Sequence, residues 1–221
     1  MNKSGIIISG GTIDDAFTLQ MLKEIGAKYV IGVDRGLEFL CNYKVVPTHV
    51  VGDFDSVDVQ VLEYFKAQNN IHIRTFNPIK DASDTEIAVR LAIELGVERL
   101  WILGATGTRL DHVMANIQTL KIAHDNGVEA YIVDTYNRIS LHEKEIRLLK
   151  EHAFGKYFSI FPFGGIVEQV TIEGAKYPLQ DYRLCPYDSR CVSNEIQENE
   201  VKIIFPAGMV ILMETRDTGT E

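Results

Sequence analysis

The first 135 residues alternate between two kinds of segment, and this alternation restricts the fold more than any other feature. Short apolar, β-branched runs typical of strands buried on both faces are separated by longer amphipathic stretches of helical period. This order predicts an α/β domain with a doubly wound, mostly parallel, Rossmann-like sheet. The expected strands are Gly5–Ser9, Tyr29–Val33, His49–Val51, Ile71–Thr75, Arg99–Leu103 and Ala130–Val133, and the expected helices are Asp14–Ile25, Arg35–Tyr43, Val57–Gln68, Asp84–Leu95 and Leu110–Asp125.

The pattern changes near residue 135. The later strand-like runs are separated by turn residues such as Gly164-Gly165, and no long segment of helical period follows. We therefore expect an antiparallel β-sandwich, and two domains that comprise residues 1–135 and 136–221. The strands expected in the second domain are Lys144–Leu149, Tyr157–Phe161, Val167–Glu173, Tyr177–Arg183, Lys202–Phe205 and Met209–Met213.

The charge balance excludes one class of partner. With 31 acidic and 22 basic side chains the net charge is −9, and no lysine- and arginine-rich cluster is present, so we expect no nucleic-acid partner. The apolar runs are too short for a membrane span and no secretory signal follows Met1, which favours a cytoplasmic protein with no membrane partner. The three cysteines, Cys41, Cys185 and Cys191, lack zinc-ligand spacing and are expected to be reduced.

Four aspartates lie where the predicted strands end. Asp34 follows the second strand, Asp53 and Asp55 follow the third, and Asp84 begins the helix after the fourth. Ligands bind at the carboxyl ends of the strands in an open parallel sheet, so these carboxylates are expected on one rim, where they repel one another. Mg²⁺ prefers such hard oxygen ligands, and the sequence predicts a magnesium site here. The Asp53-x-Asp55 spacing also occurs in unrelated nucleotide-sugar transferases.

For two of these aspartates, a purely structural role at the start of a helix is an alternative to metal binding. Asp34 precedes a predicted helix and could cap it, because aspartate is a preferred N-cap residue. Ser83 and Glu86 have the spacing of a capping box, which would place Asp84 favourably in the first helical turn. For Asp84, a structural and a functional role are equally compatible with the sequence.

Basic and glycine residues are expected on the same rim, where they would bind phosphate. Lys80 and Arg109 are the cations, although isolated residues of this type are more often solvated surface groups. Gly10 and Gly11 after the first strand, and Gly107 after the fifth, would let backbone N–H groups approach a phosphate. Neither a P-loop motif nor a clean G-x-G-x-x-G is present, which argues against P-loop and standard dinucleotide-binding proteins.

Taken together, these motifs resemble those of the thiamine pyrophosphokinase (thiamine diphosphokinase) family. Each motif alone is weakly specific, but their order and spacing over nearly the whole chain are specific. The motifs are Ser9-Gly10-Gly11, Val33-Asp34-Arg35-Gly36, Gly52-Asp53-Phe54-Asp55-Ser56, Ser83-Asp84-Thr85-Glu86, Gly107-x-Arg109-Leu110-Asp111-His112, Lys176-Tyr177-Pro178-Leu179 and Ser193-Asn194-Glu195.

The resemblance implies a reaction and an assembly. Enzymes of this family transfer a diphosphoryl group from ATP to the hydroxyl of thiamine, giving thiamine diphosphate and AMP. They are homodimers that hold thiamine between subunits. The resemblance therefore implies that residues 1–135 bind nucleotide and Mg²⁺ and catalyse the reaction, and that residues 136–221 bind thiamine.

The resemblance also implies roles for individual residues. The implied metal ligands are Asp34, Asp53, Asp55 and Asp84, the implied active-site residues near the nucleotide are Arg109 and Asp111, and the implied thiamine contacts are Ser193 and Asn194. For this reaction we expect the catalytic residues to be Asp55, Asp84, Arg109 and Asp111, with either Asp55 or Asp84 accepting the hydroxyl proton. The nucleotide-binding residues expected from the sequence remain Gly10, Gly11, Lys80, Gly107 and Arg109.

Three other functions are compatible with the same α/β domain. A pyrophosphokinase acting on another hydroxyl, such as 6-hydroxymethylpterin, would share that domain, but the motifs of the second domain favour thiamine. A nucleotide-sugar transferase would use the Asp53-x-Asp55 pair for its metal and would release a nucleoside diphosphate instead of AMP. A non-catalytic magnesium–nucleotide sensor would bind ATP without turnover.

Overall fold

The computed structural model of the protein describes residues 3–55, 57–75 and 82–219. The chain divides into two compact units, Met1–Thr135 and Tyr136–Glu221. Within the described ranges, no helix is both long enough and apolar enough to cross a membrane.

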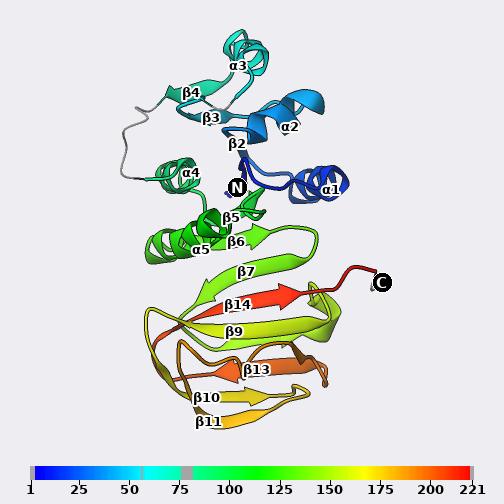
Figure 1. Ribbon diagram of the computed structural model, residues 1–221, viewed down its shortest axis with the longest axis vertical. Coiled ribbons are helices and arrows are strands. Elements are labelled where there is room, and N and C mark those ends of the chain that lie inside the picture. Colours follow the sequence, from blue (N-terminus) through cyan, green and yellow to red (C-terminus); the bar gives the residue numbers. More distant parts are fainter. Residues whose placement is uncertain (1–2, 56, 76–81, 220–221) are drawn as a thin grey trace. The chain divides into compact units, whose positions relative to one another are not determined.

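The first unit is built on a parallel sheet (Figure 1). Its strands lie in the order β6-β5-β1-β2-β3-β4, and their recorded pairings are parallel. The order reverses between β1 and β5, so the topological switch point, where ligands bind in open α/β sheets, lies at the carboxyl ends of these two strands. The strands are β1 (Ser4–Ile8), β2 (Tyr29–Val33), β3 (His49–Gly52), β4 (His72–Thr75), β5 (Arg99–Leu103) and β6 (Glu129–Val133).

Helices cover both faces of this sheet. The helices α1 (Asp15–Ile25), α2 (Gly36–Asn42) and α3 (Val59–Lys66) share one apolar core with Ile6 and Ile8 of β1. Alternate residues of a strand face opposite sides, and α4 and α5 pack on the other face (Figure 1). The prediction of a doubly wound α/β domain is confirmed. The bounds of these last two helices are Asp84–Glu94 and Leu110–Asp125.

The second unit is an antiparallel sandwich. One sheet has the strand order β12-β9-β14-β7 and the other has the order β11-β10-β13-β8. Within each of these sheets, neighbouring strands pair antiparallel. Phe158 and Ile160 from one sheet share a buried core with Val170 and Val201 from the other, which confirms the predicted sandwich. The elements are β7 (Asn137–His142), β8 (Ile146–Leu149), the 3₁₀ helix η1 (Lys150–His152), β9 (Tyr157–Phe163), β10 (Val167–Glu173), β11 (Leu179–Leu184), β12 (Asn194–Glu195), β13 (Glu200–Ile204) and β14 (Met209–Thr215).

Strands β7 and β12 are not among the strands expected from the sequence. Strand β7 is polar at four of its six positions, and its buried stretch includes Ser140. Strand β12 has only two residues, too few for any periodic pattern. Both strands are defined by their pairing with β14 and β9, respectively, and not by a local signal.

Candidate active site

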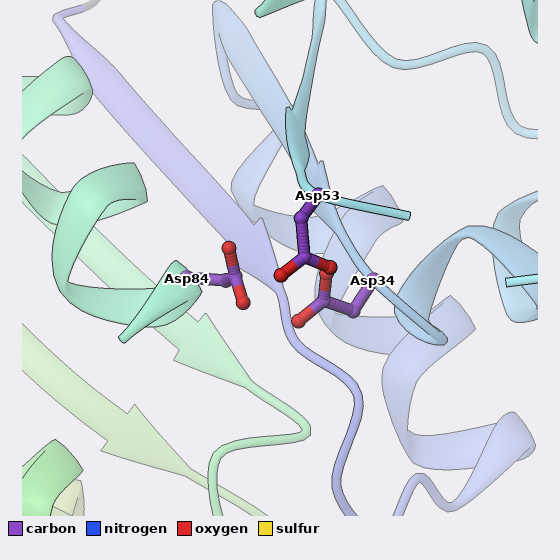
Figure 2. A group of neighbouring side chains, drawn as sticks. All are labelled: Asp34, Asp53 and Asp84. Carbon is purple, nitrogen blue, oxygen red and sulfur yellow. The ribbon is translucent and has the colours of Figure 1, made fainter. Parts of the chain in front are cut away.

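Three aspartates converge at the carboxyl ends of the strands of the first unit (Figure 2). Asp34 follows β2, Asp53 follows β3, and Asp84 is the first residue of α4. One carboxylate oxygen from each lies within 4.8 Å of the others, and all three residues are partly buried. At such a separation, two ionised carboxylates repel by about 3 kcal/mol at an effective dielectric constant of about 20. Three hard oxygen donors in this arrangement could hold a divalent metal ion.

The local backbone explains why Asp34 points into this group. Asp34 has a left-handed conformation (φ 46°), which aspartate tolerates better than most residues. Arg35 is the N-cap of α2, and the Asp34 carbonyl accepts a hydrogen bond from the Leu37 N–H (3.0 Å). Asp34 is therefore not the N-cap residue, and its carboxylate is directed towards the other two aspartates (Figure 2).

Gly52 leaves the space that the Asp34 carboxylate occupies. A Cβ atom at residue 52 would lie 2.6 Å from Oδ1 of Asp34, an atom that is itself buried. Gly52 also has a φ of 157°, which side chains rarely adopt. Sequence reasoning missed this role, although the glycine directly before Asp53 was a usable signal.

The capping prediction for α4 is correct in part, and this cap does not prevent Asp84 from joining the aspartate group. Ser83 is the N-cap, and its Oγ accepts a hydrogen bond from the Glu86 N–H (3.2 Å). The Glu86 carboxylate pairs with Arg90 one helical turn later. The carboxylate of Asp84 is directed towards the other two aspartates, so a structural role in the helix and a place in the cluster coexist (Figure 2).

Asp55, a predicted metal ligand, is not part of the three-aspartate group. Among the described residues, the carboxylate group that could hold a metal does not include Asp55. Asp55 is exposed, and its backbone N–H donates to Oδ1 of Asp53 (3.2 Å), which orients the Asp53 carboxylate. Lys80 lies outside the described residues.

A pocket of about 550 Å³ lies at the switch point, beside the aspartates. Its volume is within the range of small-ligand sites, about 300–1,000 Å³. The pocket brings together most of the predicted phosphate-binding residues, which come from separate loops. Its walls include Gly10, Gly11, Asp34, Asp84, Gly107 and Arg109, together with the start of α5.

The loops after β1 and β5 form this pocket by bonding to each other. The N–H groups of Gly11 and Thr12 donate to the carbonyls of Gly104 (2.7 Å) and Thr106 (2.8 Å). A Cβ atom at Gly11 would lie 2.3 Å from the Thr106 carbonyl oxygen. The N–H of Gly11 is therefore not available to a phosphate, which corrects that part of the prediction. Glycine is needed at this position because the two loops approach closely.

Two polar contacts that sequence reasoning missed, one buried and one partly buried, also hold the loop after β5. The Nδ2 of Asn116 in α5 donates to the Ala105 carbonyl (2.7 Å), and Asn116 is 6% exposed. The Thr106 hydroxyl donates to Asp134 (2.8 Å). An asparagine on the buried face of an amphipathic helix was a signal, because buried amides are almost always hydrogen-bonded.

Arg109 reaches the pocket as part of an ion pair. Its guanidinium donates to both carboxylate oxygens of Asp111, from Nε to Oδ1 (3.2 Å) and from Nη2 to Oδ2 (2.6 Å). These hydrogen bonds raise the pKa of Arg109 and lower the pKa of Asp111. Both side chains are largely exposed. A guanidinium held in this way at the pocket edge suits recognition of a phosphate group.

The two predicted thiamine contacts in the second unit have different surroundings. Asn194 is buried, and its amide accepts from the Tyr177 N–H (3.0 Å) and donates to the Tyr177 carbonyl (2.8 Å). Ser193 is exposed in a left-handed conformation (φ 57°), and its N–H donates to Oγ of Ser159 (3.0 Å). Asn194 therefore fixes the backbone of Tyr177, and Ser193 is the more accessible of the two side chains.

An open α/β sheet that gathers carboxylates and glycine-containing loops at its switch point is typical of metal-dependent enzymes that act on phosphorylated substrates. The family model of the thiamin pyrophosphokinase catalytic domain matches residues 22–132. The model of the thiamin pyrophosphokinase vitamin B1 binding domain matches residues 143–210. The chain belongs to the thiamin pyrophosphokinase family, and the resemblance inferred from the motifs is confirmed.

Individual relatives agree with this assignment. The chain is 29% identical over 188 residues to a thiamine pyrophosphokinase of Bacillus subtilis (strain 168), covering 85% of this chain and 87% of that protein. A crystal structure of thiamine pyrophosphokinase from Bacillus subtilis matches with a TM-score of 0.85 at 28% identity, covering 97% of this chain and 99% of that chain. A thiamin pyrophosphokinase from Geobacillus thermodenitrificans matches with a TM-score of 0.83 at 27% identity, covering 98% and 99%, respectively.

Proposed function

We propose that this protein transfers a diphosphoryl group from ATP to the hydroxyl of thiamine, giving thiamine diphosphate and AMP. The observation that carries the proposal is that models of both domains of this family match the chain in order. The three converging aspartates beside a 550 Å³ pocket supply a site of suitable chemistry. The same transfer to a pterin hydroxyl is not favoured, because the second domain matches a vitamin B1 binding model.

The metal is assigned as Mg²⁺, held by Asp34, Asp53 and Asp84. All three are hard carboxylate ligands, and the group contains no cysteine or histidine that would favour a softer ion. Mg²⁺ bound here would neutralise charge on the phosphate oxygens of ATP.

The residues of the pocket then bind and orient the nucleotide. Arg109 donates to phosphate oxygens, and Asp111 holds its guanidinium in place. Gly10 and Gly107 keep side chains out of the pocket wall, and at Gly107 a Cβ atom would lie 3.0 Å from Oγ1 of Thr12. Lys80 supplies a further cation in this proposal.

The transfer requires a nucleophile and an acceptor for its proton. The thiamine hydroxyl oxygen attacks the β-phosphorus of ATP, the bond from that phosphorus to the oxygen shared with the α-phosphate breaks, and AMP leaves with that oxygen. Of the two candidate acceptors, Asp55 is preferred to Asp84. Asp55 lies outside the three-aspartate group, and a carboxylate bound to a metal ion is the weaker base.

The second unit and the assembly complete the proposal. Residues 136–221 bind thiamine, with Ser193 as an exposed contact, and the enzyme is a cytoplasmic homodimer with thiamine between subunits. The vitamin B1 binding model, which matches residues 143–210, supports the assignment of thiamine to this unit. Sedimentation of the protein as a monomer under assay conditions would contradict the dimer.

One reaction mixture tests the activity. The protein is incubated with ATP, Mg²⁺ and thiamine, and the products are separated by chromatography. AMP and thiamine diphosphate are expected in equal amounts. Formation of ADP, or ATP binding without turnover, would contradict the proposal. In parallel mixtures, preferred transfer to added hydroxymethylpterin over thiamine, or release of a nucleoside diphosphate from an added nucleotide sugar, would also contradict it.

A further inference from the structure

Two buried hydroxyl groups join the loop after β1 to the first turn of α4. Ser9 is 2% exposed and Thr85 is 8% exposed. Their side-chain oxygens lie 3.0 Å apart, although the residues are separated by 76 positions in the chain. Burying a hydroxyl costs free energy unless it is hydrogen-bonded. Each of these two hydroxyls therefore serves as the hydrogen-bond partner that offsets the burial cost of the other.

Ser9 is fixed to the centre of the sheet. It directly follows β1, and its backbone N–H donates to the carbonyl of Leu103 on the neighbouring strand β5 (2.8 Å). A group bonded to Ser9 is therefore tied to the parallel sheet of the first unit, at the switch point where the pocket lies. Ser9 and Thr85 both line that pocket.

Thr85 is the residue after Asp84. Asp34 and Asp53 directly follow strands of the sheet, whereas Asp84 belongs to a helix. The position of the Asp84 carboxylate therefore depends on how the first turn of α4 is held. Ser83 caps that turn within the helix itself, and the bond from Thr85 to Ser9 links the turn to the sheet.

We propose that Ser9 and Thr85 are positioning residues that set the separation of Asp84 from Asp34 and Asp53, and thereby the affinity of the site for a divalent cation. They act through Asp84 and do not themselves hold the ion. The inference rests on the proposed function, in which the three aspartates hold a divalent metal. Side chains that orient metal ligands typically change metal affinity by about 10–100-fold when they are removed.

Three substitutions test the role of the hydrogen bond. Thr85→Val keeps the β-branched shape but removes the hydroxyl, Ser9→Ala removes the other hydroxyl, and Thr85→Ser keeps a hydroxyl in a smaller side chain. Binding of Mn²⁺, used as a paramagnetic probe for the Mg²⁺ site, is measured by electron paramagnetic resonance of the unbound ion. The Mg²⁺ concentration for half-maximal turnover and the KM for thiamine are measured alongside.

Thr85→Val and Ser9→Ala are each expected to weaken Mn²⁺ binding by about tenfold, with the KM for thiamine unchanged. The double variant is expected to bind no more weakly than either single variant, because both remove the same bond. Thr85→Ser is expected to remain within about twofold of the wild-type protein, since it can still bond to Ser9. If Thr85→Val fails to fold, Ser9→Ala decides the question.

Unchanged Mn²⁺ affinity in folded Thr85→Val or Ser9→Ala protein would overturn the proposal. Strictly additive losses of Mn²⁺ affinity in the double variant would also overturn it. So would a loss of Mn²⁺ affinity in Thr85→Ser as large as that in Thr85→Val. Either result would mean that side-chain packing, and not the hydrogen bond, sets the affinity. These results would leave the proposed function intact. Absence of Mn²⁺ binding by the wild-type protein would overturn the metal assignment and this inference together.

Discussion

Arg109 and Asp111 form a two-point ion pair at the edge of the pocket, with hydrogen bonds of 3.2 and 2.6 Å. The two side chains are 70% and 63% exposed, so the pair contributes little to stability. Its main physical effect is to restrict the directions in which the guanidinium can point. In the proposed function, this restriction orients Arg109 towards the phosphate oxygens of the nucleotide.

Asp111→Asn should raise the KM for ATP by about tenfold, because a neutral amide no longer holds the guanidinium as a bidentate partner. The melting temperature should change by no more than about 2 °C, as expected for an exposed pair. Steady-state kinetics and calorimetry check both parts. Glu129→Gln is the matched control, because it disrupts the similarly exposed Arg99–Glu129 pair outside the pocket. An equal rise in KM in both variants would contradict the assignment.

Asp53→Asn should have opposite effects on stability and turnover. Removing one of three mutually repelling carboxylates should raise the melting temperature of the metal-free protein, measured by calorimetry in chelator. Turnover should fall by at least about a hundredfold, the scale of losing one key electrostatic contact. Asp58→Asn is the control, because asparagine is an equally good N-cap for α3 and this residue lies outside the cluster. Wild-type turnover in folded Asp53→Asn protein would remove Asp53 from the site.

Gly52→Ala should abolish Mn²⁺ binding at the cluster, because the added Cβ atom would lie 2.6 Å from Oδ1 of Asp34. The alanine would also be strained at the φ of residue 52, so a fall in melting temperature is expected. Gly165→Ala is the control, since among the described residues no atom beyond its two chain neighbours lies within 4 Å of the position of its Cβ. Undiminished Mn²⁺ binding in Gly52→Ala would show that Asp34 is not a ligand.

Asn194→Ala should lower the free energy of unfolding by about 1–3 kcal/mol, because it leaves the N–H and carbonyl of Tyr177 without their buried amide partner. Ser193→Ala should change it by less than about 0.5 kcal/mol, because the Ser193 side chain is exposed. Urea denaturation measures both. For Ser193→Ala, a rise in the KM for thiamine without loss of stability is expected. Similar stability losses in the two variants would contradict this distinction.

Burial raises the pKa of the Cys191 thiol to about 11. The folded state therefore holds this proton more tightly than the unfolded state, so the associated stability is present at neutral pH and is lost as the pH rises from about 9 towards 11. Over this range, the free energy of unfolding should fall more steeply for the wild-type protein than for Cys191→Ala. At pH 8 a thiol reagent should modify the partly exposed Cys41 much faster than Cys191. Equal reaction rates in the folded protein would contradict the burial effect.

Much of the fold follows from local patterns. Helical and strand periods correctly predict the elements of the first unit, because each period depends on residues that are close in the sequence. The polar strand β7 and the two-residue strand β12 lack such a pattern, since only pairing with distant strands defines them. The family follows from the order of short motifs, which is also a property of the sequence.

The candidate site is predicted less completely. Because the carboxyl ends of parallel strands lie at one edge of a sheet, it is predictable that Asp34, Asp53 and Asp84 share one rim, but not that Asp55 lies outside their group. The distinction depends on a tight turn in which the Asp55 N–H donates to Asp53. The direction of a side chain at a strand end is set by a few backbone angles, which residue type alone does not specify.

Local patterns in the chain are therefore enough to predict the α/β and β-sandwich classes, the family and the residues that supply carboxylates. Folding in three dimensions selects which carboxylates converge, pairs the Gly11 N–H with Gly104, and brings Asn194 to Tyr177. The difference lies in the distance along the chain over which each interaction acts. Periodicity acts between near neighbours, whereas contacts such as the bond between Ser9 and Thr85, 76 positions apart, exist only after the chain has folded.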